Sequence, residues 1–275
     1  MIGDQQPRVF DELAGTYDES FTDRLPGQWL RSMVQARIAD LLPREAEILE
    51  VGCGTGEDAI HFAKLGHNVT ATDVSNEMLA QTRRKLAGAS SVVRDRVRVD
   101  AMDAADPGSA GLPCDRNLDL VFSNFGALNC VADPQPLFDY ANLRLLPGGH
   151  LAITMMGRYC GWEILGFATR GDFRRATRRW RGSGKFLAGG VEQRVSYPTI
   201  AAIRRIVPAN FRLTAVYAVG ALLPNSEFFN LCERWPKIFR KLAVAENAIA
   251  GWWPVNRLGD HFLMVLRKES EGWSN

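Results

Sequence analysis

The sequence has 275 residues, of which 46% are hydrophobic, and a formal net charge of +2 at pH 7. This length and composition predict a globular chain that folds as one large domain, or as one domain with a sizeable insertion. A net charge so close to zero does not by itself indicate a nucleic-acid partner.

The cysteines and histidines are scattered along the chain, and none of them have the spacing of metal ligands. Five widely spaced cysteines without a Cys-x-x-Cys pair are typical of reduced thiols. The N-terminus lacks the basic start and apolar core of a signal peptide, and no run approaches the roughly 18 apolar residues of a membrane span. We therefore expect a cytoplasmic protein without a structural metal and without a transmembrane segment.

Residues 1–47 are predicted to form a helical cap in front of the first strand. An apolar stripe from Phe10 to Tyr17 predicts one helix, and a second stripe from Trp29 to Leu41 predicts another. Pro26-Gly27 is expected to separate the two helices, because neither residue favours a helix interior.

The stretch from Ile48 to Gly56 is the most informative part of the chain. Its apolar start, which contains Glu50, predicts a buried parallel strand, and three alternating glycines follow. Apolar residues at helical spacing predict a helix over 57–65. Glycines at the N-terminus of a helix allow a ligand to approach the bare backbone, so this turn is a candidate binding site.

Four further strands are predicted before residue 157. The second ends at Asp73, 21 positions after Gly52, which is the distance at which a doubly wound nucleotide-binding fold places an acid for ribose hydroxyls. Strands that alternate with helices imply a parallel sheet with helices on both faces, and its ligands bind at the C-terminal strand ends. The four strands are expected at 68–72, 96–99, 118–124 and 150–156, with polar residues Glu50, Asp73, Asp100 and Asn124 at the strand ends.

The segment from 157 to 257 departs from this alternation. Its first part, up to residue 190, is rich in aromatic residues and arginine. Later elements are expected as a strand at 191–197, a helix at 199–207, a strand at 211–219, a helix at 226–250 interrupted at Pro236, and a closing strand at 261–266.

The glycine pattern argues against a pyrophosphate ligand. A dinucleotide fingerprint has the spacing Gly-x-Gly-x-x-Gly, whereas Glu57 stands at the position of its last glycine here. Glu57 and Asp58 at a helix N-terminus would repel a phosphate, and the Walker lysine is absent. A ligand with an adenine, a ribose and a zwitterionic amino-acid tail fits this turn better.

The segment Glu50-Val51-Gly52-Cys53-Gly54-Thr55-Gly56, with Asp73 at the next strand end, resembles the first two motifs of class I S-adenosylmethionine-dependent methyltransferases. Residues 10–18 resemble the N-terminal Phe-Asp-x-x-Ala-x-x-Tyr-Asp pattern of the small-molecule branch, and residues 145–149 resemble the turn before its fifth strand. The resemblance implies an α/β, Rossmann-like, doubly wound and mostly parallel seven-stranded sheet. It implies a helical cap at 1–47, a cofactor-binding core at 48–156, an acceptor-binding insertion or lid after strand five at 157–257, and a closing strand and tail at 258–275.

The resemblance also implies a pocket for S-adenosyl-L-methionine, with S-adenosyl-L-homocysteine as the product. The glycines would lie against the methionine part, with Glu50 orienting its amino group. Asp73 would accept hydrogen bonds from the ribose hydroxyls, and Asp100 would meet the adenine edge unless a shift in the third strand gives that role to Asp103. The implied cofactor-binding residues are Tyr17, Glu50, Gly52, Cys53, Gly54, Gly56, Asp73, Val74, Met78, Asp100, Ala101, Met102, Asn124 and Phe125.

The acceptor is expected under residues 157–257, where aromatic density indicates an apolar or flat substrate. Arginines recur from Arg170 to Arg181, and those at 174, 178 and 181 can share one helical face. They form either a solvated helix side or a site for an anionic group of the substrate, a carrier protein, an acidic membrane surface or RNA. Peripheral membrane contact and the oligomeric state stay open.

We therefore expect methyl transfer by in-line displacement to a small, hydrophobic or lipid-like acceptor, most readily at oxygen. Candidate bases are His261, which Asp260 can orient, and Tyr159 and Glu163 after the fifth strand, while a carboxylate acceptor needs no base. RNA methylation is less expected, because residues 123–126 lack the Asn/Asp-Pro-Pro-aromatic motif of amino-methylating nucleic-acid enzymes. Two alternatives remain, namely a non-catalytic S-adenosylmethionine sensor and an RNA methyltransferase that uses the arginine-rich segment.

Overall fold

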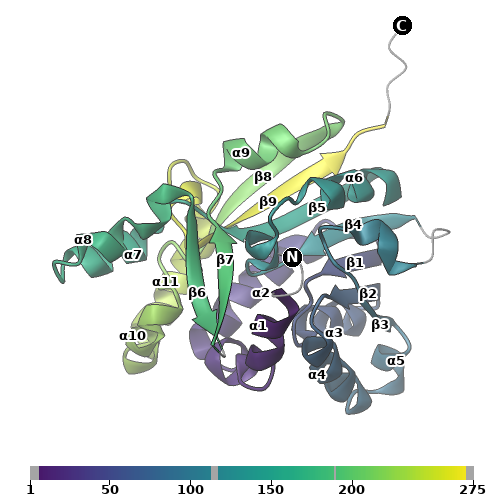
Figure 1. Ribbon diagram of the computed structural model, residues 1–275, viewed down its shortest axis with the longest axis horizontal. Helices are drawn as coiled ribbons and strands as arrows, with labels where there is room; N and C mark the ends of the chain where they lie inside the picture. The colour runs from purple at the N-terminus through teal and green to yellow at the C-terminus, as the bar shows by residue number, and fades with distance from the viewer. Residues whose placement is uncertain (1–5, 113–116, 189, 271–275) are drawn as a thin grey trace, which may run out of the picture.

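A seven-stranded sheet with helices on both faces forms the centre of the molecule (Figure 1). The structure is a computed structural model that describes residues 6–112, 117–188 and 190–270. In spatial order the strands are β3 (Val97–Ala101), β2 (Asn68–Asp73), β1 (Glu47–Val51), β4 (Leu118–Ser123), β5 (Leu145–Met156), β9 (His261–Lys268) and β8 (Phe211–Val219).

The strands β1 to β5 run parallel, and β9 is antiparallel to both β5 and β8. The predicted α/β, mostly parallel sheet of seven strands is therefore confirmed. Both faces of β1 are buried, since Ile48 packs into the core on one side of the sheet and Leu49 into the core on the other. This burial explains why the strand reads as an almost continuous apolar run.

The helices of the N-terminal half connect the parallel strands and form the cap. They are α1 (Gln6–Leu13), the π-helical turn η1 (Asp18–Thr22), α2 (Leu25–Ala39), α3 (Glu57–Lys64), α4 (Asn76–Ala87), α5 (Ser91–Arg94), the 3-10 turns η2 (Pro107–Ala110) and η3 (Ala127–Cys130), and α6 (Gln135–Arg144).

The remaining elements lie between β5 and β9 along the chain. Besides β8 they are α7 (Gly161–Ala168), α8 (Phe173–Ala176), η4 (Arg178–Arg181), the hairpin strands β6 (Ser183–Ala188) and β7 (Val191–Ser196), α9 (Ile200–Ile206), η5 (Ser226–Phe228), α10 (Phe229–Arg234), α11 (Pro236–Ile249) and η6 (Val255–Arg257).

The N-terminal cap differs from its prediction at Pro26-Gly27. These residues lie in the first turn of α2 and do not separate two helices. Proline is tolerated there because the first N–H groups of a helix have no intrahelical acceptor. The break lies earlier, where α1 ends at Leu13 and η1 follows Tyr17.

Two strand boundaries also differ from the sequence prediction. The third strand continues to Ala101, beyond the expected end at residue 99, and pairs with β2 over its whole length. The turn expected at 147–149 lies inside β5, where the register with β4 shifts. The glycines lie in a bulge at this point, and the strand continues beyond it.

The segment after β5 contributes both to the sheet and to a cover. Strand β8 joins the sheet edge, whereas β6 and β7 form a separate hairpin that stands beside α1 (Figure 1). The prediction that Arg174, Arg178 and Arg181 share one helical face was wrong, because α8 ends at Ala176 and η4 is a separate turn. In the described part of the chain, no helix is long and apolar enough to cross a membrane.

Candidate active site

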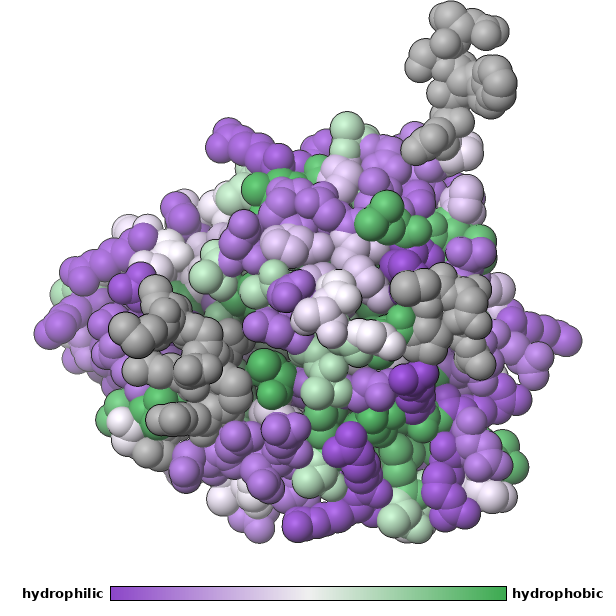
Figure 2. Space-filling view, turned by 45° about the vertical axis from the view of Figure 1, so that its right-hand side comes forward, coloured by the Kyte–Doolittle hydropathy of each residue, from purple (hydrophilic) through white to green (hydrophobic). Residues whose placement is uncertain are grey.

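A cavity of about 390 Å³ opens at the C-terminal ends of β1, β2 and β4, the edge at which such sheets bind ligands. Apolar side chains gather in the lower middle of the largely hydrophilic face shown in Figure 2. The cavity brings together nine of the residues expected to bind the cofactor, namely Tyr17, Gly52, Gly54, Asp73, Val74, Met78, Met102, Asn124 and Phe125.

Asp73 lies at the end of β2 and lines this cavity. Its Oδ2 accepts a hydrogen bond from Gly54 N at 2.9 Å, and its Oδ1 accepts one from Ser75 N at 2.9 Å. Burial raises the pKa of the Asp73 carboxyl, and the backbone hydrogen bonds oppose that rise. Because a carboxylate has about four acceptor positions, Asp73 can still accept from two hydroxyls of a ligand.

The three glycines after β1 have positive φ values, but each is needed for a different reason. A Cβ at Gly52 would lie 2.3 Å from Ala127 Cβ, and one at Gly56 would lie 2.5 Å from Thr82 Cγ2. A Cβ at Gly54 would have no atom within 4 Å, although Gly54 lines the cavity. Gly54 therefore leaves space for a ligand, whereas the other two allow close packing.

Glu50 lies behind the glycine turn, is 2% exposed and does not line the cavity. Burial raises its pKa well above the usual value, and the charge of Asp58 adds to this effect, while Arg31 opposes it. Its Oε2 has no hydrogen-bond partner among the described residues. A ligand ammonium group would give this buried oxygen a partner, so the residues present fit the amino-acid end of S-adenosylmethionine.

The structure separates the two acids that are candidates for the adenine contact. Asp103 lines the cavity, whereas Asp100 forms an ion pair with Arg98 on the same strand. Ala101 is exposed, and the buried Met102 reaches the cavity. The preference for Asp100 does not agree with this geometry, because β3 extends beyond residue 99 and only the residues after it turn toward the cavity.

Cys53 and Gly56 lie beside the cavity and not in its lining. The Cys53 Sγ packs 4.0 Å from Thr82 Oγ1, and burial raises the pKa of its thiol well above the ordinary value. A protonated, enclosed thiol is a poor nucleophile, so Cys53 acts as a small spacer in the turn.

The helical cap closes the cavity through Phe10, Leu13 and Tyr17. It is fastened by two aspartates whose role the sequence did not reveal. Asp18 Oδ1 accepts from Thr55 Oγ1 at 2.7 Å, and Asp18 Oδ2 lies 2.6 Å from Lys85 Nζ. Asp11 accepts from Ser75 Oγ at 2.6 Å, which attaches α1 to the start of α4.

The hairpin and the segments after β4 and β5 also contribute to the cavity. Phe186 of β6 and Met156 of β5 line it, together with Cys130, Val131 and Ser226. The sequence shows Phe186 only as one of many aromatic residues in this segment. No local pattern predicts that Phe186 reaches the cavity, because its position depends on how the hairpin packs on α1.

His261 lies at the start of β9, next to part of this cavity lining. Its ring packs edge-on against Phe125, with the centroids 5.6 Å apart, and its Nδ1 lies 3.1 Å from Asp260 Oδ2. A Cβ placed on Gly126 would be 3.6 Å from His261 Nε2 and 3.3 Å from Met156 Cε. Gly126 and Met156 line the cavity. Because residue 126 has no side chain, Nε2 of His261 is not shielded from the cavity at this position.

The other two candidate bases do not lie at the cavity. Tyr159 is 43% exposed and packs against Trp180. Glu163 is buried and ion-paired with Arg178 at 2.7 Å and Arg179 at 2.5 Å.

Cys160, Glu163 and Asp260 are the one group of potential metal ligands that converges among the described residues. The Arg179 guanidinium lies 2.5 Å from an oxygen of each carboxylate and occupies the position between them. This group is therefore an ion-pair network.

Comparison with known proteins places residues 49–151 in a family model described as a methyltransferase domain. The chain is 34% identical to the demethylmenaquinone methyltransferase of Clavibacter sepedonicus over 54% of this chain and 57% of that one. It is 28% identical to the tRNA 5-carboxymethoxyuridine methyltransferase of Escherichia coli K12, again over 54% of this chain and 56% of the relative. The chain thus spans just over half the length of these two relatives.

Among solved structures, a putative S-adenosylmethionine-dependent methyltransferase from Listeria monocytogenes superimposes with a TM-score of 0.56. The two share 15% identity, and the match covers 87% of this chain and 100% of the other. This likeness concerns the fold. Together with the family match, it identifies residues 49–151 as a methyltransferase domain in a chain with the class I fold of S-adenosylmethionine-dependent methyltransferases.

Proposed function

We propose that the protein transfers a methyl group from S-adenosyl-L-methionine to a small apolar acceptor, at an oxygen atom. The observation that carries this proposal is the composition of one cavity. Its lining includes Asp73 and Gly54, with the unpartnered Glu50 oxygen behind them, and it also includes the apolar side chains of Phe125 and Met156, with His261 beside Phe125. Groups suited to the cofactor and apolar side chains in one enclosure favour direct transfer between two bound molecules.

Glu50, Asp73 and Asp103 would hold the cofactor at its amino, ribose and adenine groups. Bound S-adenosylmethionine would supply an electrophilic methyl group with a neutral leaving group. Tyr17 and Phe186 would exclude water from above, because the cap and the hairpin meet over the cavity.

His261 is the group best placed to accept a proton from an acceptor hydroxyl, through Nε2. Burial raises the pKa of the neighbouring Asp260 carboxyl, but the charges of His261 and Arg179 outweigh it and hold that pKa below its usual range. Asp260 therefore stays a carboxylate, and a proton on Nδ1 of His261 would face it across 3.1 Å. A phenol or enol fits this arrangement, because such a hydroxyl is weakly nucleophilic until it loses its proton.

An RNA acceptor is the second candidate, because one relative is a tRNA methyltransferase. The arginine-rich segment gives it limited support. Arg175 and Arg178 pair with Glu227, and Arg179 pairs with Glu163 and Asp260. These three guanidinium groups are therefore committed within the protein, and fewer remain for phosphate contacts.

Two measurements test the proposal. Titration calorimetry with S-adenosylmethionine and S-adenosylhomocysteine tests the pocket, and the absence of binding by both ligands would refute it. A screen with methyl-labelled cofactor against phenols, carboxylic acids, acyl thioesters and total tRNA tests the acceptor. Label in an apolar phenol supports the proposal, label in tRNA alone favours the second candidate, and cofactor binding without any transfer identifies a sensor.

A further inference from the structure

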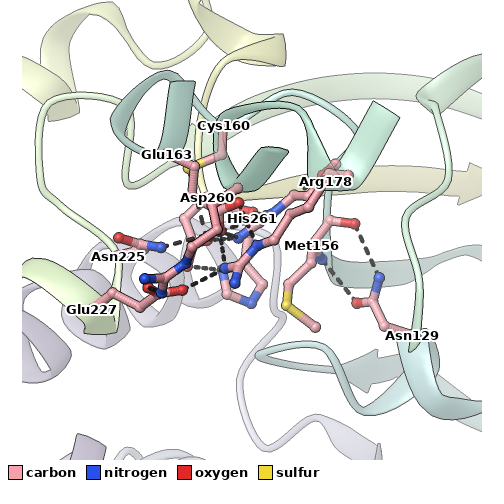
Figure 3. A network of polar contacts seen from close by, with 12 residues as sticks. Asn129, Met156, Cys160, Glu163, Arg178, Asn225, Glu227, Asp260 and His261 are labelled. Carbon is pink, nitrogen blue, oxygen red and sulfur yellow. Dashed lines mark hydrogen bonds and ion pairs between the residues drawn. The ribbon is translucent and has the colours of Figure 1, made fainter. Parts of the chain in front are cut away.

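A cluster of buried charged residues lies behind His261, where the segment after β5 meets the start of β9 (Figure 3). Its centre is Arg179 of η4, which is 5% exposed. We use the name Arg179 cluster for Glu163, Arg178, Arg179, Asn225 and Asp260. None of these residues lines the cavity, so the cluster has no direct part in binding.

Arg179 contacts Asp260 through two acceptors at once. Its Nη2 donates to Asp260 Oδ1 at 2.5 Å, and its Nη1 donates to the Asp260 backbone oxygen at 2.8 Å. A guanidinium that binds both the side chain and the main chain of one residue fixes the rotation of that side chain.

Glu163 holds Arg179 in this position. Its Oε1 accepts from Nε of Arg179 at 3.0 Å and from Nη2 at 2.5 Å. The same carboxylate also accepts from Arg178 and from Asn225. The cluster therefore links α7, η4, the loop before η5 and the residue before β9.

The other oxygen of Asp260, Oδ2, lies 3.1 Å from Nδ1 of His261. The two atoms do not have hydrogen-bond geometry, and Nδ1 of His261 has no hydrogen-bond partner among the described residues. Asp260 is nevertheless within reach of a proton on Nδ1, and such a proton would leave the lone pair on Nε2, the nitrogen near Gly126 and the cavity.

We propose that Arg179 is a positioning residue for methyl transfer. It acts on His261 through Asp260, and it connects the segment after β5 to this candidate base. This inference rests on the proposed function of His261. In the step it supports, the acceptor hydroxyl gives its proton to Nε2, its oxygen forms the bond to the methyl carbon, and the electrons of the broken carbon–sulfur bond return to sulfur. Arg179 takes no part in this exchange and acts only on the orientation of the base.

Several charged or titratable groups lie around Asp260 and His261. Asp260 directly precedes β9 and lies next to His261, Arg179 and Glu163 stand behind Asp260, and Cys160 Sγ lies 4.0 Å from Asp260 Oδ1. Burial raises the pKa of the Cys160 thiol to about 12, so it stays neutral. Changes at Asp260 or Arg179 should therefore act on His261 through the position of the Asp260 carboxylate.

The test is a double-mutant cycle of Arg179→Met and Asp260→Asn, measured as kcat with an acceptor found in the methyl-transfer screen. Each single variant should lower kcat about 100-fold, the scale of a displaced general base. The acceptor KM and the affinity for S-adenosylhomocysteine should change less than three-fold. The double variant should be no slower than Asp260→Asn, because Arg179 acts through Asp260.

Matched variants separate positioning from folding. Arg179→Lys keeps the charge and should recover part of kcat, whereas Arg174→Met, at an exposed arginine of the same segment, should leave kcat unchanged. If Arg179→Met does not fold, Arg179→Lys and Asp260→Asn still complete the comparison. Additive losses, or a loss confined to KM, would overturn the proposal.

A second readout needs no turnover. Nuclear magnetic resonance of labelled histidines reports the surroundings of each imidazole. Asp260→Asn and Arg179→Met should both shift the side-chain resonances of His261 and leave those of His67 unaltered. Unchanged resonances of His261 in both variants would defeat the positioning role. Absence of transfer to any acceptor would instead defeat the proposed function, and the resonances would still decide the coupling.

Discussion

The carboxylate of Asp73 accepts a hydrogen bond from the backbone N–H of Gly54, across 2.9 Å. This bond joins the end of β2 to the glycine turn after β1, so Asp73 and the turn form one unit. It also holds Gly54 at φ +54° with its Cα facing open space in the cavity.

Gly54→Ala should abolish cofactor binding while the fold persists. The new methyl group would meet no protein atom within 4 Å, so it would occupy ligand space. The left-handed backbone would cost about 1 kcal/mol of stability. We expect calorimetry to show at least roughly 100-fold weaker binding of S-adenosylhomocysteine, which is about 2.7 kcal/mol.

Gly52→Ala is the matched comparison, with the opposite expected outcome. Its Cβ would lie 2.3 Å from Ala127 Cβ, so the thermal unfolding midpoint should fall by several degrees. If Gly54→Ala lowered the midpoint as much as Gly52→Ala and kept its affinity, the assignment of Gly54 to the cofactor surface would be wrong.

Glu50→Gln should stabilise the ligand-free protein and weaken cofactor binding. Burial raises the pKa of Glu50 well above 4.5, so its protonated form contributes stability that is fully present below the unfolded-state pKa. That stability is lost as pH rises through the folded-state pKa, whereas glutamine stays neutral. The gain in unfolding midpoint should be small at pH 4 and larger at pH 8, as thermal melts by circular dichroism can show.

The same variant removes the negative partner proposed for the ligand ammonium group. Affinity for S-adenosylmethionine should fall about 10-fold, in line with the loss of one charged hydrogen bond. A stability gain that did not change with pH, or an unchanged affinity, would contradict the role given to Glu50.

Asp18→Ala should loosen the cap over the cavity. Asp18 contacts Thr55 in the glycine turn and Lys85 in α4, so it links η1 to both elements. Loss of a partly exposed carboxylate with two partners should weaken cofactor binding by about 1 kcal/mol, or roughly five-fold, mainly through faster release. Stopped-flow measurement of the dissociation rate checks this, with the exposed neighbour Glu19→Ala as the control expected to change nothing.

Much of this architecture could be predicted because it is encoded locally. Alternating apolar strands and helices gave the parallel sheet, and the distance between Gly52 and Asp73 indicated the site, since a strand, turn and helix of ordinary length fix that spacing. The error at Asp100 has an equally local cause. Pairing with β2 extends β3 to Ala101, and apolar periodicity cannot determine where such pairing stops.

The Arg179 cluster and the contribution of the hairpin to the cavity were not predictable in the same way. Arg179 and Asp260 are 81 positions apart, and the sequence shows only a run of arginines that also suits a solvated helix. Their pairing depends on how α7 and η4 pack against the end of β9. Sequence reasoning therefore predicted the residues at the strand ends that line the cavity, whereas the contribution of the segment after β5 depends on the tertiary structure.

Phe186→Ala should raise the acceptor KM about 10-fold and leave cofactor affinity unchanged. Phe186 lines the cavity from the hairpin, and removing an aromatic side chain from an apolar pocket costs about 1–3 kcal/mol of binding free energy. Leu187→Ala is the matched control, because neighbouring residues of a strand face opposite sides and Leu187 is 71% exposed. Initial rates with an apolar phenol identified by the screen give both constants. Equal effects of the two substitutions would show that the hairpin does not contact the acceptor, and a change in cofactor affinity would place Phe186 beside the cofactor.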